Sequence, residues 1–460
     1  MSISADPRRA GPHVSGETLR AGAPGYDEAR AVWNARFDRR PEVIVRAAAP
    51  GDIVAALKYA REHDLAVSVK GGGHAYAGNS VLDGGLLIDL GPMNQVSVDA
   101  DLRRATVGAG ARWGAVDEAT QAVGLATPGG TVSTVGVAGL TLGGGEGWLS
   151  RVHGLACDNL VGADVVTASG AMVRASDTEN PDLFWGLRGG SGNLGIVTSF
   201  EFALHSLDHQ ILAGQVIHPF DRAPELLRSY RDYFEDAVDE AVCFPFVYRV
   251  PPLDVFPAEC HGEIVLALVM AFMGPLADGE RHLAPLRALA APILDGVAPH
   301  TYVGLQQSFD AGMGNGNRWY SRAHFLDTLS DEAIDILVDR VDPLPGEFTT
   351  VYLGPGGGAV GRKRPDATAF PHRTSAHQLH IFPGWIDADR DEEIMAWTRR
   401  ISDAVVPCSS GGVYVNLLGE DERSRVPAAY GSNYERLTRL KTKWDPDNRF
   451  RSNHNIPPRP

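Results

Sequence analysis

The chain is poor in cysteine, and the cysteines that it has lie far apart in the sequence. No two of its four cysteines form a C-x-x-C pair; they are Cys157, Cys243, Cys260 and Cys408. A structural zinc site or a disulfide framework uses closely spaced or paired cysteines, so the sequence favours neither. We predict buried thiols at these positions.

The chain also lacks the marks of membrane, secreted and nucleic-acid-binding proteins. No apolar run approaches the roughly 18 residues that a spanning helix needs, and the first residues lack the apolar core of a signal peptide. Its 42 Lys and Arg face 57 Asp and Glu, which gives a net charge of −15. Nucleic acids and anionic membranes repel so acidic a chain. We therefore expect a cytoplasmic protein with a small-molecule substrate, as a monomer or homodimer.

Glycine, in contrast, is abundant, and three consecutive glycines follow a predicted strand at 66–69. The segment continues as Lys70-Gly71-Gly72-Gly73-His74-Ala75-Tyr76 and reaches Ser80. Residues without a Cβ let the backbone adopt φ > 0 and bring its N–H groups against an anion such as a phosphate. His74 adds an imidazole nucleophile to this loop. For this segment alone, a glycine-rich turn around a packed histidine remains the alternative.

A second concentration of glycine, with small hydroxyl residues, covers residues 127–148. Such a composition cannot pack a conventional core. It predicts an extended backbone wrapped along a long planar or phosphorylated ligand. A strand is predicted to start at 156 and to run to 166.

Residues 190–195 satisfy the dinucleotide pattern G-x-G-x-x-G, but in the wrong context. A Rossmann fingerprint opens a helix, whereas the alternating, β-branched and aromatic stretch 196–202 predicts a strand here. A Rossmann fold is therefore not favoured.

Hydrophobic periodicity predicts an α+β protein of two domains. In the first half, strands are predicted at 43–45, 86–90 and 104–108 and helices at 26–37, 50–60 and 113–123. Beyond 209, strands are predicted at 211–217, 242–250, 264–272, 348–353, 377–382 and 412–418, and helices at 224–236, 280–289, 331–341, 391–401 and 430–444. Residues 1–26 are read as a loose arm.

Four segments in this order resemble the berberine-bridge-enzyme-like flavoprotein oxidases, in the vanillyl-alcohol-oxidase class with PCMH-type FAD-binding folds. They are the loop 71–74, the stretch 132–160, the turn and strand 190–197, and the tail 430–456. The resemblance covers nearly the whole chain. It implies an FAD-binding domain at 27–208, a substrate domain at 209–417 whose antiparallel sheet covers the isoalloxazine, and a berberine-bridge-like segment at 418–460 that completes the FAD domain.

The resemblance also implies how FAD is held. The family joins FAD covalently to the histidine at His74, and many members add a cysteine link at the position where Val132 stands, so a single link is expected. Cys157 is expected to be a structural thiol near the cofactor, and Val135 matches a valine that goes with oxidases. The other cofactor-binding residues that the resemblance implies are Lys70, Gly71, Gly72, Gly73, Asn79, Ser80, Gly130, Thr131, Gly136, Gly139, Leu140, Gly144, Gly145, Asp158, Asn159, Gly195, Val197, Asn416, Asn453 and Asn455.

Three tyrosines are candidates for the catalytic base. Such an enzyme needs the substrate C–H aimed at flavin N5 and a base for the departing O–H or N–H proton. Tyr414 matches the family's Y-x-N element, and on a strand it would share one face with Asn416. Tyr76, two residues beyond His74, and Tyr352, on a predicted substrate-domain strand that faces the site, rank second. A core aromatic residue with a paired hydroxyl is the alternative for each. A phenolate at neutral pH needs stabilisation, since the free phenol has a pKa of about 10.

Other chemistries are not supported. His377 and His380 lie three apart on a predicted strand and so face opposite sides, which makes a poor metal pair; no metal site is predicted. We expect an FAD-dependent oxidase that removes a hydride from an alcohol or amine carbon and passes electrons to O₂, giving H₂O₂. Two alternatives are a dehydrogenase with another acceptor and a flavin-containing binding or resistance protein that sequesters an aromatic compound.

Overall fold

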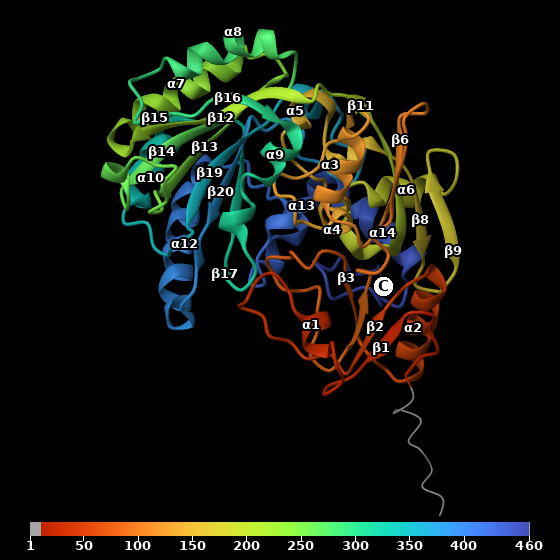
Figure 1. Cartoon of the computed structure of the whole chain (residues 1–460). Helices are drawn as coiled ribbons and strands as arrows, with labels where there is room; N and C mark the ends of the chain where they lie inside the picture. Colours follow the sequence, from red (N-terminus) through yellow and green to blue (C-terminus); the bar gives the residue numbers. More distant parts are fainter. Residues whose placement is uncertain (1–10, 460) are drawn as a thin grey trace, which may run out of the picture.

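A small sheet near the start of the chain carries the first glycine loop. The computed structural model describes residues 11–459 (Figure 1). Strands β2 (Val43–Arg46), β4 (Leu86–Asp89) and β3 (Val67–Lys70) are parallel, and β1 (Glu17–Leu19) is antiparallel at the edge, in the order β1-β2-β4-β3. Helix α2 (Pro50–Glu62) connects β2 to β3 and buries Ile53, Ala56 and Leu57, which recur at helical spacing. The glycine loop begins where β3 ends.

A second, five-stranded antiparallel sheet follows the first. Its order is β5-β6-β10-β8-β9. Helix α3 (Trp113–Gln121) packs beside β5, and α6 (Pro181–Leu187) beside β9. The strands are β5 (Val96–Asp99), β6 (Arg104–Gly108), β8 (Leu160–Val166), β9 (Met172–Ser176) and β10 (Ile196–Ala203), and the short pair β7 (Leu125–Ala126) and β11 (His205–Ser206) lies apart. Strand β10 directly follows the turn 191–193, which confirms that this G-x-G-x-x-G does not open a helix.

The largest sheet belongs to the second half of the chain and is antiparallel. Side chains alternate between the two faces of this sheet along each strand, and each face forms a separate hydrophobic core. One core packs on helices α7 (Ala223–Glu235), α8 (Leu276–Arg287), α10 (Asp331–Val341) and α12 (Asp391–Val405), which cover the outer face (Figure 1). The other core meets Trp148 and Leu149 of the second glycine segment together with α9 (Tyr302–Gln307). The strands are β12 (Gln210–Pro219), β13 (Ala241–Arg249), β14 (Ile264–Phe272), β15 (Leu294–Asp295), β16 (Ala298–Thr301), β18 (Arg322–Leu326), β19 (Thr350–Pro355) and β20 (His377–Phe382).

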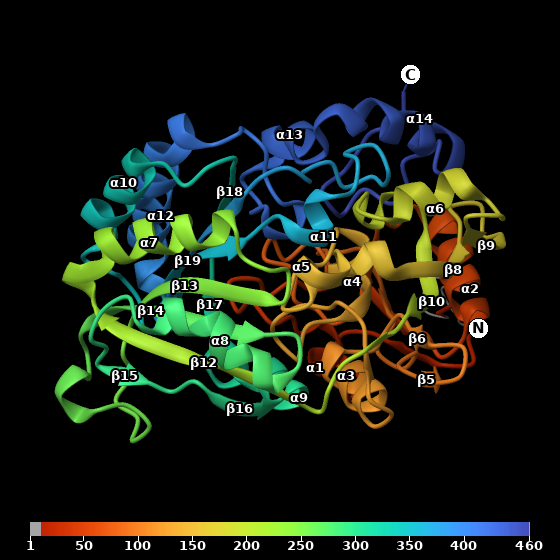
Figure 2. The same cartoon turned by 90° about the horizontal axis from the view of Figure 1, so that it is seen from above.

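The tail returns to the first half of the chain. Helix α14 (Tyr434–Trp444) packs against α6, after the short helix α13 (Val426–Tyr430) (Figure 2). The buried Nζ of Lys441 donates to Asn193 O at 2.9 Å and pairs with Asp445 at 2.7 Å. The backbone of Ile456 donates to Asn193 Oδ1 at 3.0 Å. These bonds fix the tail beside the turn that precedes β10.

Several sequence expectations were wrong in detail. Residues 127–148 are not extended throughout, because Val137, Ala138, Thr141 and Leu142 share a buried face on helix α4 (Val137–Leu142); α5 (Ser150–His153) follows. The predicted strand 412–418 is instead a 3₁₀ turn at Val415–Leu417, since a short buried apolar run has no period that separates the two. Residues 156–159 likewise form a 3₁₀ turn before β8.

The ends of two elements also differ from expectation. The predicted helix 26–37 is only α1 (Tyr26–Arg30). The predicted loose arm is ordered from residue 11, because β1 pairs with β2 and the Asp52 carboxylate accepts from the backbone of Ser15 and Gly16; its residues 1–10 lie outside the described residues. Cys408 is only partly buried, unlike the other three cysteines. None of the helices in residues 11–459 combines the length and apolar character that crossing a membrane requires.

Candidate active site

A cavity of about 340 Å³ lies between the glycine-rich segments and the large sheet. Residues 71–77, 130–132, 135–136 and 138–140 line it from the first half of the chain, and Asn453 and the stretch 414–417 line it from the tail. The sheet contributes an aromatic wall of Phe244, Phe246, Tyr352 and His380. The fold thus brings together the segments that carried the resemblance.

His74 lies in this cavity and is held by ring stacking. Its imidazole stacks on the Trp33 indole with centroids 5.1 Å apart and planes 17° from parallel. Trp33 is fixed by its Nε1–H, which donates to Met313 O at 2.7 Å. Burial, with a smaller contribution from the positive charge of Arg112, lowers the pKa of His74 to about 4. The imidazole is therefore neutral near pH 7 and keeps a nucleophilic nitrogen lone pair.

The two glycine-rich segments cross at Gly72 and Gly136. A Cβ on Gly72 would lie 2.4 Å from Gly136 N, and one on Gly136 would lie 2.3 Å from Gly72 N. No side chain fits at either position without separating the two backbones. Gly139 differs, because a Cβ there would meet no other atom within 4 Å. Since Gly139 lines the cavity, backbone is open to a ligand there.

Polar atoms without partners support the same interpretation. Ser80 Oγ and Asn453 Oδ1 are buried, have no hydrogen-bond partner among the described residues, and belong to residues that line the cavity. Buried polar groups are normally paired, so these two indicate a ligand with polar groups. Together with the open backbone at Gly139, they fit the dinucleotide FAD that the resemblance implies.

Tyr414 presents its hydroxyl to two N–H donors. The backbone N–H of Gly145 donates to it at 2.8 Å and the Asn416 side chain at 2.9 Å. The Asn416 Nδ2 also donates to Leu140 O at 3.0 Å, which fixes the amide. Burial raises the pKa of Tyr414, and both hydrogen bonds act in the opposite direction. Tyr414 and Asn416 are thus neighbours as predicted, although a 3₁₀ turn and not a strand brings them together.

Tyr76, from the first glycine loop, and Tyr352, in the aromatic wall, also line the cavity. Tyr76 packs edge-on against Trp33 at 5.4 Å and Phe382 at 5.1 Å. Tyr352 stacks on His380 with centroids 4.2 Å apart. Burial raises the pKa of both tyrosines. Neither hydroxyl has a hydrogen-bond donor among the described residues, which separates both from Tyr414.

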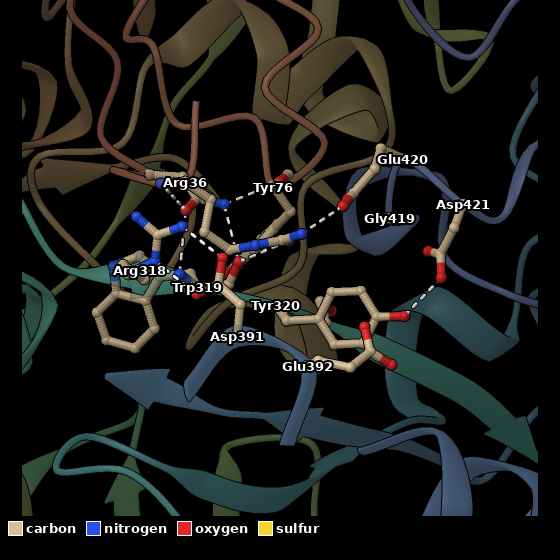
Figure 3. Close-up of polar contacts among 12 residues, drawn as sticks. Arg36, Tyr76, Arg318, Trp319, Tyr320, Asp391, Glu392, Gly419, Glu420 and Asp421 are labelled. Carbon is tan, nitrogen blue, oxygen red and sulfur yellow. Dashed lines mark hydrogen bonds and ion pairs between the residues drawn. The ribbon is translucent and has the colours of Figure 1, made fainter. Parts of the chain in front are cut away.

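A polar network behind Tyr76 ties the glycine loop to the second half of the chain (Figure 3). The buried Asn34 amide donates to Tyr76 O and to Trp319 O, both at 2.9 Å, and accepts from Trp319 N at 3.0 Å. Arg36 pairs with Glu420 at 2.6 Å, and Arg318 pairs with Asp391 at 2.5 Å. The network sets the position of the loop that carries His74 and Tyr76.

Some predicted cofactor residues have other roles and do not line the cavity. Lys70 Nζ donates to Ala29 O and lies 3.8 Å from Asp89. Asp158 accepts two bonds from Arg373, at 2.6 and 2.9 Å, and both side chains are wholly buried. These side chains are occupied by contacts within the protein, and their role at the cofactor stays a prediction.

Four further predicted residues lie outside the cavity lining. Asn159 Nδ2 donates to His153 O and Leu155 O, so its amide shapes a turn. Asn455 Oδ1 is buried without a partner. Gly144 and Gly145 act through the backbone: both have positive φ, and a Cβ on Gly145 would lie 2.5 Å from Ala156 Cβ. The remaining predicted cofactor residues, Gly71, Gly72, Gly73, His74, Asn79, Ser80, Gly130, Thr131, Val135, Gly136, Gly139, Leu140, Gly195, Val197, Asn416 and Asn453, line the cavity.

The two positions considered for a second flavin link differ in location. Val132 is buried and lines the cavity. Cys157 is buried but does not line it, and burial raises the pKa of its thiol to about 12. A thiol that stays protonated is a poor nucleophile. A structural role for Cys157 fits this environment.

Glu146 is a cavity residue that sequence reasoning missed. It is the only charged residue in the glycine-rich stretch 127–148, and this was the available signal. Its carboxylate lines the cavity and has no hydrogen bond or ion pair within residues 11–459. Burial raises the pKa of Glu146 to about 7. The cavity therefore holds an acid that titrates near neutral pH.

Comparison with known proteins agrees with this geometry. The family model described as "FAD binding domain" matches residues 41–176, and the model "Berberine and berberine like" matches residues 413–457. The chain is 32% identical to (R)-6-hydroxynicotine oxidase of Paenarthrobacter nicotinovorans, over 97% of each sequence.

Solved structures share the fold. The crystal structure of 6-hydroxy-D-nicotine oxidase from Arthrobacter nicotinovorans superposes with a TM-score of 0.87 at 29% identity, covering 97% of this chain and 99% of that one. Glucooligosaccharide oxidase from Acremonium strictum, described with a 6-S-cysteinyl, 8α-N1-histidyl FAD, gives a TM-score of 0.84 at 26% identity, over 94% and 95% of the two chains. The α+β architecture is thus that of the PCMH-type FAD oxidases. This chain belongs to the berberine-bridge-enzyme-like family of FAD-linked oxidoreductases.

Proposed function

We propose that this protein is an FAD-dependent oxidase that removes two electrons from an alcohol or amine carbon and passes them to O₂, giving H₂O₂. When bound, FAD supplies the hydride acceptor at N5. Two of the relatives above are named oxidases, one of hydroxynicotine and one of glucooligosaccharides, which supports this chemistry. Val135 lines the cavity at the position where a valine goes with reaction with O₂.

The observation that carries the proposal is the pair of N–H donors on the Tyr414 oxygen. Both donors stabilise a negative charge on that oxygen, which burial alone would disfavour. As a phenolate, Tyr414 takes the proton of the substrate O–H or N–H. The C–H carbon then loses its hydrogen as hydride, and the C–O or C–N bond becomes double. Position and charge are the contribution of the protein.

We further propose that FAD is linked covalently through His74 alone. The neutral imidazole of His74 is nucleophilic, and Val132 has no thiol with which to form the second link. The other cavity-lining glycines and polar residues hold the dinucleotide without covalent bonds.

An absorbance spectrum of the purified protein before and after acid precipitation, with its intact mass, tests the cofactor assignment. We expect a yellow pellet and one FAD of added mass, and we expect both to be lost in His74→Ala. A yellow supernatant would instead mean noncovalent flavin, and a colourless protein would overturn the cofactor assignment.

Reoxidation tests the electron acceptor. The holoenzyme is reduced under anaerobic conditions by members of a panel of alcohols and amines and is then mixed with air. Rapid return of the oxidised flavin spectrum, with H₂O₂ formed, is the expected result. Slow reoxidation would indicate a dehydrogenase, and a flavin that no panel member reduces would favour a binding protein.

A further inference from the structure

We infer that Glu146 is the anchor for a positively charged amine, so that the substrate carries a basic nitrogen on an apolar body. The inference rests on the proposed function, because it names the substrate class of the same cavity. Three observations support it: the position of Glu146, the absence of a basic side chain beside it among the described residues, and the aromatic wall of the same cavity.

Glu146 lies between the candidate base and the large sheet. It directly follows Gly145, whose N–H donates to the Tyr414 hydroxyl. On its other side its carboxylate approaches strand β19, since a Cβ on Gly354 would lie 3.1 Å from Glu146 Oε1. Tyr352 is on the same strand, two residues before Gly354. A group bound at Glu146 is therefore next to the site of proton transfer.

No basic side chain within residues 11–459 neutralises Glu146. The described residues that line the cavity include no Lys or Arg, and Glu146 is the only carboxylate among them. The cavity histidines do not supply a charge either, because burial lowers the pKa of His74 and His454 to about 4 and that of His380 to about 3. An unpaired carboxylate in such a place is costly unless a ligand brings the opposite charge.

The aromatic wall of the cavity is built of rings that also attract cations. Phe246 stacks on Tyr352 with centroids 4.5 Å apart and contacts Phe309 at 5.4 Å. The Phe244 ring meets the Trp148 ring edge-on, with centroids 4.9 Å apart, and Trp148 is two residues after Glu146 in the chain. A single carboxylate in a cavity with an aromatic wall suits an ammonium group, because ring faces attract cations and the rest of the ligand packs on the rings.

The ionisation of Glu146 makes this recognition depend on pH. The titratable groups that face it are the hydroxyls of Tyr230, Tyr352 and Tyr414. Burial raises the pKa of each, which keeps Tyr230 and Tyr352 neutral near pH 7, whereas at Tyr414 the Gly145 and Asn416 hydrogen bonds oppose this effect. Glu146 itself, with a pKa of about 7, is mostly neutral below that pH and mostly ionised above it. Affinity for a cationic amine rises as pH passes upward through this range, until the amine loses its own proton.

The test compares two ligands of similar shape, benzylamine and benzyl alcohol. Their dissociation constants are measured calorimetrically on the anaerobic holoprotein at about pH 6 and about pH 8, for the unmodified chain, Glu146→Gln and Glu118→Gln. Glu118 is an exposed acid on α3, so its variant makes the same charge change away from the cavity. The ratio of the two constants within each protein is the readout, so a general loss of affinity in one variant does not affect the conclusion.

We expect benzylamine to bind about 10- to 100-fold tighter than benzyl alcohol at the higher pH, as for a charged hydrogen bond. The preference shrinks at the lower pH, persists in Glu118→Gln and disappears in Glu146→Gln. An unchanged preference in Glu146→Gln would overturn the inference. So would an unchanged benzylamine affinity combined with slower flavin reduction, because Glu146 would then act as a base. The ratio needs no turnover, so a protein that fails as an oxidase can still show the preference.

Discussion

Asp117 gives the fold a pH-dependent stability that its structure allows us to estimate. The side chain lies on α3, is only 1% exposed, and accepts from Gln306 Nε2 on α9 at 2.9 Å. Gln306 Oε1 is buried without a partner, so a protonated Asp117 has an acceptor beside it. Burial raises the pKa of Asp117 to about 7, against the opposing effect of the Gln306 hydrogen bond.

The sign of the effect follows from the raised pKa. The unfolded carboxyl has a pKa of about 3.9, so the native state holds its proton more tightly than the unfolded state does. The resulting stabilisation is complete below about pH 4 and is lost as pH rises through about 7. At about 1.4 kcal/mol for each tenfold change in acidity, the loss is at most about 4 kcal/mol.

Asp117→Asn makes the test. Asparagine keeps the shape of the neutral acid; its oxygen can accept from Gln306 Nε2, and its amide N–H can donate to the free Gln306 Oε1. At about pH 4 the variant and the unmodified protein should unfold alike, within about 0.5 kcal/mol. At about pH 8 the variant should be more stable by about 2 to 4 kcal/mol, a rise in Tm of several degrees.

Thermal unfolding followed by circular dichroism from about pH 4 to about pH 8.5 measures the difference. Asp403→Asn, the same substitution at an exposed position on α12, is the matched control and should show no such pH trend. A difference between Asp117→Asn and the unmodified chain that stays constant with pH would refute the reasoning, because the native carboxyl would then titrate as it does in the unfolded chain.

Three further predictions concern the site and its support. Tyr414→Phe should keep its flavin and slow anaerobic flavin reduction by about 10²- to 10⁴-fold; full activity in stopped-flow would remove the base assignment. Asp158→Asn should lower the free energy of unfolding by about 3 kcal/mol or more, because it leaves the buried Arg373 guanidinium unpaired; an unchanged Tm would contradict this. Val132→Cys in a His74→Ala background should restore acid-stable flavin, seen as a yellow pellet and added mass, whereas flavin that stays in the supernatant would show that residue 132 cannot reach it.

Much of the fold could be predicted from local pattern. The strands β12, β13, β14 and β20 and the helices α7 and α10 lie close to where hydrophobic periodicity placed them. The failures were in buried glycine-rich or short apolar segments. In the glycine-rich segment, helix α4 forms because its buried face packs on the core. Amino-acid composition alone does not predict this packing.

The site was predictable where backbone geometry imposes the residue type. The crossing of Gly72 and Gly136 demands glycine, and the loop with His74 follows from it. Glu146 was missed because its significance lies in what surrounds it, a cavity without basic side chains that forms only from distant strands. The ion pair of Asp158 could not be predicted for the same reason, since its partner Arg373 is far along the chain.

The crossing at Gly72 and Gly136 also bears on how the two candidate attachment positions, residues 74 and 132, are spaced. Because the two backbones touch there, the loop that carries His74 and the segment that carries Val132 form one rigid joint. The spacing between the two attachment positions is therefore set by main chain and is independent of which side chain stands at residue 132. Under the attachment through His74 proposed above, an exchange at residue 132 alone would add or remove a second anchor and leave this crossing unchanged.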